Sequence, residues 1–166
     1  MKNVFRRLLI LPFMLSLMIA FCSCGPKDFE VYIFSDLSEC RTIEIEKPDG
    51  VQVTSYDSPA GDPYIKELIY NDYYACNYSS DEVRFDLFAY EFPDQATAQE
   101  YFKNATGKDT TKAVNFSDSQ GLTTYRRVVI SNNLAYSVLA KASDADASIE
   151  IINKVFSEKI IDVEWQ

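Results

Sequence analysis

Histidine is absent from the 166 residues of this chain, and that absence removes many of the common catalytic sites. Histidine is the side chain that titrates near neutral pH and the commonest metal ligand. Ser–His–Asp catalysis, Cys–His catalysis and histidine-liganded zinc sites are therefore excluded. The chain also lacks a glycine-rich phosphate loop, a GxSxG motif and a CxxC pair. We predict a protein without a metal or cofactor, and most simply not an enzyme. A hydrolase using two carboxylates about 5–10 Å apart is the catalytic alternative.

Basic residues are scarce, with 16 Lys and Arg against 25 Asp and Glu. Three of the basic residues, and none of the acidic ones, precede Cys24, so the rest of the chain has 13 basic residues and a net charge of −12. Such a charge repels the phosphate backbone of nucleic acids. We therefore expect no nucleic-acid partner.

The first residues combine positive charge, an apolar run and small residues before a cysteine. Lys2, Arg6 and Arg7 precede an apolar run from Leu8 to Phe21, and Cys22-Ser23-Cys24-Gly25 follows. The run is shorter than the roughly 20 residues of a membrane-spanning helix and suits the core of a secretion signal.

This segment resembles the leader of bacterial lipoproteins, in which small residues precede a cysteine that is acylated and becomes the new N-terminus. Ser23 precedes Cys24 as in that pattern, whereas Phe21 stands where leucine is usual. The resemblance implies a signal peptide over residues 1–23, lipidation at Cys24, a tether over 24–28 and one domain over 29–166. It implies that the domain is exported and lies on the outer side of a bacterial membrane. A cleaved signal without lipid and an uncleaved anchor are the alternatives.

The leader also divides the four cysteines. Cys22 would be removed and Cys24 acylated, which leaves Cys40 and Cys76. Two cysteines in an oxidising compartment favour a disulfide. Two buried free thiols are the alternative, because spacing alone does not show that the residues are close.

The first half of the domain has the pattern of β-strands. Residues 41–46 and 51–56 alternate apolar with polar side chains around the turn at 47–50, which predicts a hairpin. Residues 72–78 and 82–92 predict a second hairpin. The strand over 82–92 carries aromatic residues on both faces, as a strand covered on two sides does.

The second half combines two helices with another hairpin. Asp94 as the N-cap and Gly107 as the C-terminal glycine predict a helix over 94–107. Strands over 122–131 and 134–141 meet at two asparagines, and an apolar stripe predicts a helix over 146–161. We predict an α+β fold, an antiparallel sheet with both helices packed on one face.

Tyrosines are unevenly distributed. Five of the eleven fall in one stretch: Tyr64, Tyr70, Tyr73, Tyr74 and Tyr78. Tyrosine is common at recognition surfaces, because it combines apolar area with a hydrogen-bonding tip. It also has high β-propensity, so a half-buried sheet face is the alternative explanation.

These patterns favour a non-enzymatic domain, attached to the membrane by lipid, that binds a partner protein or an envelope component through the tyrosines. A small one-domain receptor for transport or sensing is the alternative binding function, and it requires a pocket of about 300–1,000 Å³.

Overall fold

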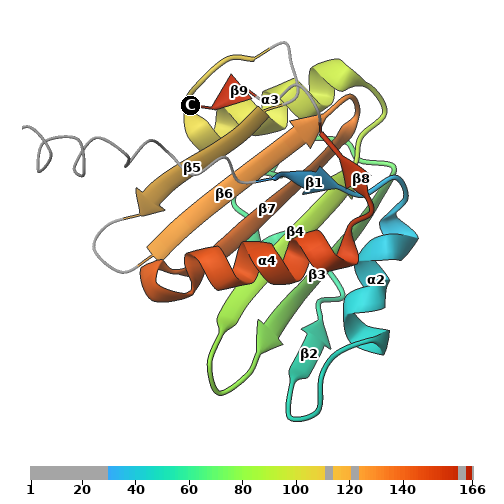
Figure 1. The fold of residues 1–166 in the computed structure, drawn as a ribbon. Coiled ribbons are helices and arrows are strands. Elements are labelled where there is room, and N and C mark those ends of the chain that lie inside the picture. Colours follow the sequence, from blue (N-terminus) through green and yellow to red (C-terminus); the bar gives the residue numbers. More distant parts are fainter. Residues whose placement is uncertain (1–29, 111–113, 121–123, 161–163, 166) are drawn as a thin grey trace, which may run out of the picture.

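A seven-stranded sheet forms the centre of the molecule (Figure 1). The computed structural model describes residues 30–110, 114–120, 124–160 and 164–165, with side chains described over 30–110 and 124–160. Across the sheet the strands are β2 (Gln52–Ser55), β3 (Asp72–Ser79), β4 (Arg84–Glu91), β7 (Leu134–Lys141), β6 (Thr124–Ser131), β5 (Val114–Gln120) and β9 (Glu164–Trp165). Neighbouring strands are antiparallel except for β5 and β9. Together with the helices, the sheet confirms the predicted α+β class.

In the described part of the chain three α-helices cover the sheet, and they lie on both of its faces. These are α2 (Leu37–Ile45), α3 (Gln95–Thr106) and α4 (Ala145–Val155). Helices α2 and α4 pack on one face together with Leu87 of β4, whereas α3 packs on the other face with Phe88 and Tyr90 of the same strand. Figure 1 shows α4 in front of the sheet and α3 behind it. The prediction that both helices share one face is wrong, because β4 has apolar side chains on two sides and each side needs a cover.

Residues 37–45 form helix α2, so the strand predicted over 41–46 is wrong. The Asp36 carboxylate caps the helix by accepting a 2.7 Å hydrogen bond from the Ser38 amide. Every third residue is buried, at Leu37, Cys40 and Ile43, whereas Ile45 is 80% exposed. The predicted hairpin with 51–56 does not form, and β2 pairs with β3 instead.

Other local predictions are confirmed. Strands β3 and β4 form the expected hairpin, as do β6 and β7, where Asn132 adopts a φ of +54°. The Asp94 carboxylate caps α3 by accepting from the Thr97 amide at 2.8 Å, and Gly107 ends that helix with a φ of +75°.

Helix α4 ends at Val155, six residues before the predicted end. Phe156 is extended, and β8 (Glu158–Lys159) then pairs with β1 (Tyr32–Ile33) in a two-stranded sheet. The apolar stripe nevertheless stays buried, with Ile152, Phe156 and Ile160 in one cluster. Beyond Val155, pairing with β1 takes over the backbone hydrogen bonding from the helix. The apolar side chains therefore stay buried although the backbone is no longer helical.

The predicted signal peptide, the tether and Cys24 lie outside the described residues. Within the described part of the chain, no helix has the length and apolarity needed to cross a membrane.

Candidate functional site

The five clustered tyrosines are divided between the two faces of the sheet. Tyr74 and Tyr78 are buried on the face of α2 and α4, with 5% and 4% of their surface exposed. Tyr64, Tyr70 and Tyr73 are half-buried and pack around the cluster on the face of α3. Only Tyr73 and Tyr74 line the same hollow, which we call the edge groove.

The edge groove has a volume of about 420 Å³. It opens at the edge of the sheet, between α2 and the chain that follows β2. Its lining is Arg41, Glu44, Ser55, Tyr56, Asp57, Asp72, Tyr73, Tyr74 and Ala75. Because successive side chains of a strand point to opposite faces, Tyr73 and Tyr74 contribute to it from both sides of the sheet.

The groove exists because β2 is shorter than β3. Strand β2 ends at Ser55, opposite Cys76, and a further backbone hydrogen bond of 2.8 Å runs from Tyr56 N to Ala75 O. The chain then turns away into the short 3₁₀ helix η1 (Pro59–Gly61). Residues 72–74 of β3 therefore have no strand beside them on this side among the described residues.

Polar contacts hold the walls of the groove. The Tyr74 hydroxyl donates a 2.8 Å hydrogen bond to Glu44 Oε1, and the Ser55 hydroxyl donates to the same oxygen. These two donors lower the pKa of Glu44. A tyrosine from the sheet, a serine from β2 and a carboxylate from α2 therefore meet at one point.

The opposite wall contains Tyr73 and two aspartates. The Tyr73 hydroxyl donates to the backbone oxygen of Asp57 at 2.6 Å. The Tyr73 amide donates to Oδ1 of Asp72 at 2.8 Å. Three carboxylates and one guanidinium, that of Arg41, line the groove, so its charge is predominantly negative.

Two exposed apolar side chains lie near lining residues of the groove along the chain. Ile45 lies one helical turn beyond Arg41 on α2, and Ile69 is 74% exposed just before Tyr70. The Tyr70 ring meets the Tyr73 ring edge to face, with 5.6 Å between centroids. Ile45 and Ile69 are the two large apolar residues that are most exposed among the described side chains, and Ile45 directly follows Glu44 of the groove wall.

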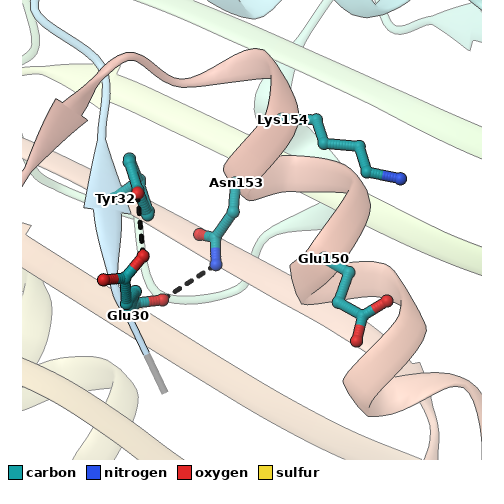
Figure 2. A pocket seen from close by; sticks show the side chains of 5 residues that line it. All are labelled: Glu30, Tyr32, Glu150, Asn153 and Lys154. Atoms are coloured by element: carbon teal, nitrogen blue, oxygen red, sulfur yellow. Dashed lines mark hydrogen bonds between the residues drawn. The ribbon is translucent and has the colours of Figure 1, made fainter. Parts of the chain in front are cut away.

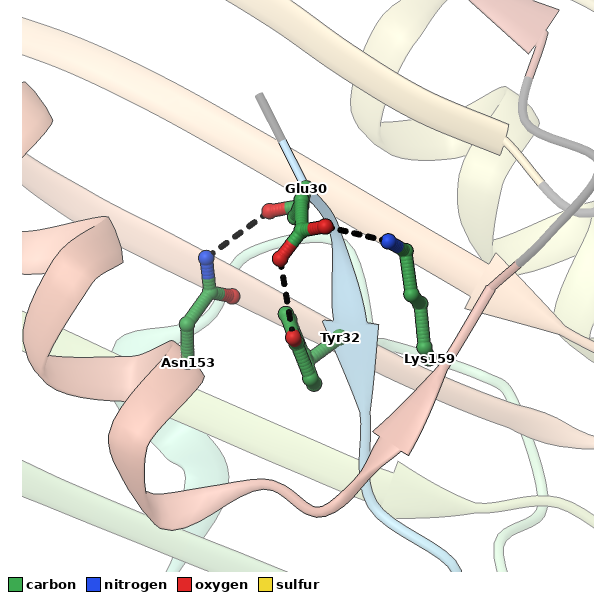
Figure 3. A network of polar contacts seen from close by, with 4 residues as sticks. All are labelled: Glu30, Tyr32, Asn153 and Lys159. Carbon is green, nitrogen blue, oxygen red and sulfur yellow. Dashed lines mark hydrogen bonds and ion pairs between the residues drawn. The ribbon is translucent and has the colours of Figure 1, made fainter. Parts of the chain in front are cut away.

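A second hollow of about 350 Å³ lies between β1 and α4 (Figure 2). It is lined by Glu30, Tyr32, Glu150, Asn153 and Lys154. Figure 3 shows the contacts of Glu30 beside this hollow: its carboxylate accepts from the Tyr32 hydroxyl at 3.0 Å and pairs with Lys159. The Asn153 amide donates to the Glu30 backbone oxygen at 2.8 Å. These bonds fasten the start of the described chain to α4 and β8, so we assign this hollow a structural role.

A buried carboxylate lies between the sheet and α3, and no sequence pattern predicted it. Oδ2 of Asp62 accepts hydrogen bonds from the hydroxyls of Tyr90 and Tyr101 at 2.9 and 2.7 Å. The Asp62 side chain is almost fully buried and has no place among the lining residues of either hollow. It therefore anchors the loop after β2 to the sheet and to α3.

Cys40 and Cys76 are free thiols buried in the same apolar cluster, on α2 and β3. Burial raises the pKa of Cys76 to about 12 and that of Cys40 well above its ordinary value. In the structure the two thiols are buried and not bonded to each other. Whether they form a disulfide in solution is not tested by it, so the disulfide stays a prediction. Within the described residues, no group of three or more acidic or sulfur side chains is placed to hold a metal ion.

No family model matches this chain, and no curated protein matches it. Among solved structures, the extracellular domain of PknH from Mycobacterium tuberculosis is similar at 17% sequence identity and a TM-score of 0.36. The alignment covers 74% of this chain and 92% of that chain. A likeness at this level says nothing about function, which must be inferred from the residues of the edge groove.

Proposed function

We propose that this protein is a lipid-anchored extracytoplasmic binding domain that holds a partner protein or an envelope component in the edge groove. The observation that carries the proposal is the groove itself. It brings Tyr56, Tyr73 and Tyr74 together with charged groups at an open sheet edge.

The lining of the groove suits recognition. Tyrosine buries apolar area and keeps a hydroxyl for hydrogen bonding, and it loses little conformational entropy when it is ordered. The half-buried rings of Tyr56 and Tyr73 are fixed by hydrogen bonds to Asp86 and to the Asp57 backbone. A partner would therefore meet aromatic surfaces that are already in place.

Binding is a better explanation of this groove than carboxylate chemistry. A carboxyl that donates a proton near neutral pH needs a raised pKa. The hydrogen bonds from Ser55 and Tyr74 lower the pKa of Glu44 instead. Together with the absence of histidine, this leaves recognition as the role that these residues support.

The lipid anchor is supported by the leader and gives the binding domain its location. Acyl chains contribute about 0.8 kcal/mol per buried methylene, so two or more chains hold a protein firmly on a membrane. The acidic chain has no electrostatic attraction to anionic lipid, so attachment would depend on Cys24.

A small-ligand receptor is the second candidate, favoured by the volume of the groove. About 420 Å³ lies within the range of small-molecule sites, roughly 300–1,000 Å³. Exposed Ile45, next to Glu44 of the groove wall, favours a macromolecular partner, because a small ligand in the groove would leave it uncovered.

Site-specific photocrosslinking in cells tests the proposal. A benzophenone amino acid replaces Tyr56 in the groove and, in a matched control, Glu82 in the exposed β3–β4 turn. We expect a discrete adduct from position 56 that position 82 does not give. Protease treatment distinguishes a protein adduct from a glycan, and a mass increase of a few hundred daltons indicates a small ligand. Identical patterns from both positions, or no adduct from position 56, would overturn the proposal.

A further inference from the structure

We propose that the partner is an extended, basic peptide segment that adds to the sheet as a strand beside Asp72–Tyr74 of β3. This inference rests on the proposed function, since it names the kind of partner that the edge groove would bind. Strand addition to an open sheet edge is a general mode of peptide recognition.

The register of the sheet shows where backbone groups are open to such a strand. The bond from Tyr56 N to Ala75 O places the backbone of Ala75 toward the β2 side. In antiparallel sheets the backbone groups of every second residue point toward the same neighbouring strand. The amide and carbonyl of Tyr73, two residues before Ala75, therefore also point toward the β2 side. Beyond Tyr56, the chain leaves this line for η1. Three residues of β3, about 10 Å of edge, are therefore open to an added strand.

The Tyr73 amide shows how the open edge is satisfied in the unbound protein. It donates to Oδ1 of the preceding residue, Asp72, at 2.8 Å. This carboxylate lies where the carbonyl of an added strand would lie. A bound segment would take over the Tyr73 amide through its own carbonyl oxygen and leave the Asp72 carboxylate to accept from a cation.

The charges beside this edge select a basic segment. Asp57 and Asp72 lie on the side of the loop and Glu44 on the side of α2, against the single guanidinium of Arg41. The net charge of the whole chain, −9, adds an attractive field for a cationic partner. Lysine or arginine side chains of an added strand would lie among these carboxylates, and its apolar side chains would contact Tyr73.

The test uses the full-length protein in detergent micelles and three synthetic seven-residue peptides. One alternates lysine with valine, the second has glutamate in place of lysine, and the third is the lysine peptide methylated on every backbone amide. Backbone amide shifts and hydrogen exchange are measured by NMR. We expect the lysine peptide to shift the amides of residues 72–75 and to slow exchange at Tyr73. The other two peptides should bind at least about tenfold more weakly, because one loses the charge attraction and the other the backbone donors.

Matched protein variants separate the role of charge from that of shape. The double variant Asp57→Asn/Asp72→Asn keeps side-chain oxygens that can accept hydrogen bonds and removes two negative charges. It should weaken the lysine peptide about fivefold or more. Asp81→Asn, in the exposed β3–β4 turn, changes one charge away from the groove and should leave binding unchanged.

Each contrary result has a definite meaning. Equal binding of the methylated peptide would overturn strand addition, and equal binding of the glutamate peptide would overturn the preference for basic segments. Absence of peptide binding, with the crosslink at position 56 intact, would overturn this inference and leave the proposed function standing. Loss of that crosslink would overturn the proposed function itself. A dimer seen by sedimentation, and abolished by Tyr73→Pro, would show that the edge pairs with a second copy of the chain and would overturn the inference.

Discussion

The Tyr101 hydroxyl of helix α3 donates a 2.7 Å hydrogen bond to Oδ2 of Asp62, in the loop that follows β2. Tyr90 of β4 donates to the same oxygen at 2.9 Å, and the Tyr64 amide donates to Oδ1 at 3.1 Å. One buried carboxylate thus joins a helix, a strand and a loop. The same loop leaves the sheet after Tyr56 and so determines where the edge groove begins.

Asp62→Ala should destabilise the fold, because it leaves the buried hydroxyls of Tyr90 and Tyr101 without this acceptor. A buried polar group without a partner costs about 1–3 kcal/mol, so we expect a loss of about 2–5 kcal/mol in the free energy of unfolding. Asp62→Asn keeps one acceptor oxygen and should lose less. Urea denaturation at pH 7 measures both variants. A change below about 0.5 kcal/mol for Asp62→Ala, the size usual for surface substitutions, would contradict the anchoring role.

The fold should lose stability at alkaline pH through its buried tyrosines. Burial, followed by the hydrogen bond to Asp86, raises the pKa of Tyr56 to about 12, and burial raises the pKa of Tyr90 and Tyr101 further. In the unfolded chain these phenols titrate near pH 10, so the folded state binds more protons above that pH. The stabilisation is complete below pH 10 and is lost as the pH rises through 12.

Urea midpoints between pH 8 and 12, read together with tyrosinate absorbance, measure this effect. Tyrosinate absorbance from the buried rings should increase together with unfolding. In Tyr56→Phe, the part of the stability loss due to that phenol should disappear. Full ionisation of all tyrosines near pH 10 in a protein that remains folded would contradict the burial described here.

Cys40 and Cys76 should resist thiol reagents while the protein is folded. Both side chains have no exposed surface, and a pKa of about 12 leaves only about one thiolate in ten thousand at pH 8 for Cys76. Peptide mapping after labelling at pH 8 should find neither residue modified in buffer. Modification of both in urea without a reductant would show that the thiols are free, as in the structure. Labelling in urea only after reduction would show that the pair forms a disulfide.

Cys24→Ser should release the protein from membranes. Acylation needs the cysteine, and a chain from which the leader is cleaved without acylation keeps neither the apolar run nor acyl chains to hold it on a membrane. Fractionation measures the loss, and Cys22→Ser serves as the matched control because it leaves the acylated residue in place. Unchanged membrane association of Cys24→Ser, or an intact mass that retains residues 1–23, would contradict the lipoprotein assignment.

Local signals predicted much of the fold. Asp94 and Gly107 predicted the ends of α3, because caps act through their own turn of backbone. Residues 41–46 were misassigned because Ile43 and Ile45 alternate as they would in a strand. Leu37, Cys40 and Ile43 are buried at every third position, which is a helical pattern. This pattern can be recognised only if Asp36 is taken as the N-cap at which the helix starts.

The site was predicted in part. Clustering of tyrosines indicated the region, and Tyr73 and Tyr74 do line the groove. Glu44 and Arg41 were not predicted, since they reach the groove only because residues 37–45 are helical and pack beside β3. The end of β2 at Ser55 was also not predictable locally, because it depends on pairing with a strand some twenty residues later.

The pairing of β1 with β8 determines how the domain responds to mechanical load. A pull on the chain ahead of Glu30 reaches β1 first, where two residue pairs, the Glu30–Lys159 ion pair and the bond from Asn153 to Glu30 resist it. Strand β1 is also fastened to the seven-stranded sheet, because the Tyr136 hydroxyl of β7 donates a 3.0 Å hydrogen bond to the Tyr32 backbone oxygen. Because β1 runs into α2 after only three residues, and α2 supplies Arg41 and Glu44 to the edge groove, a load on the N-terminal side would be transmitted to one wall of that groove.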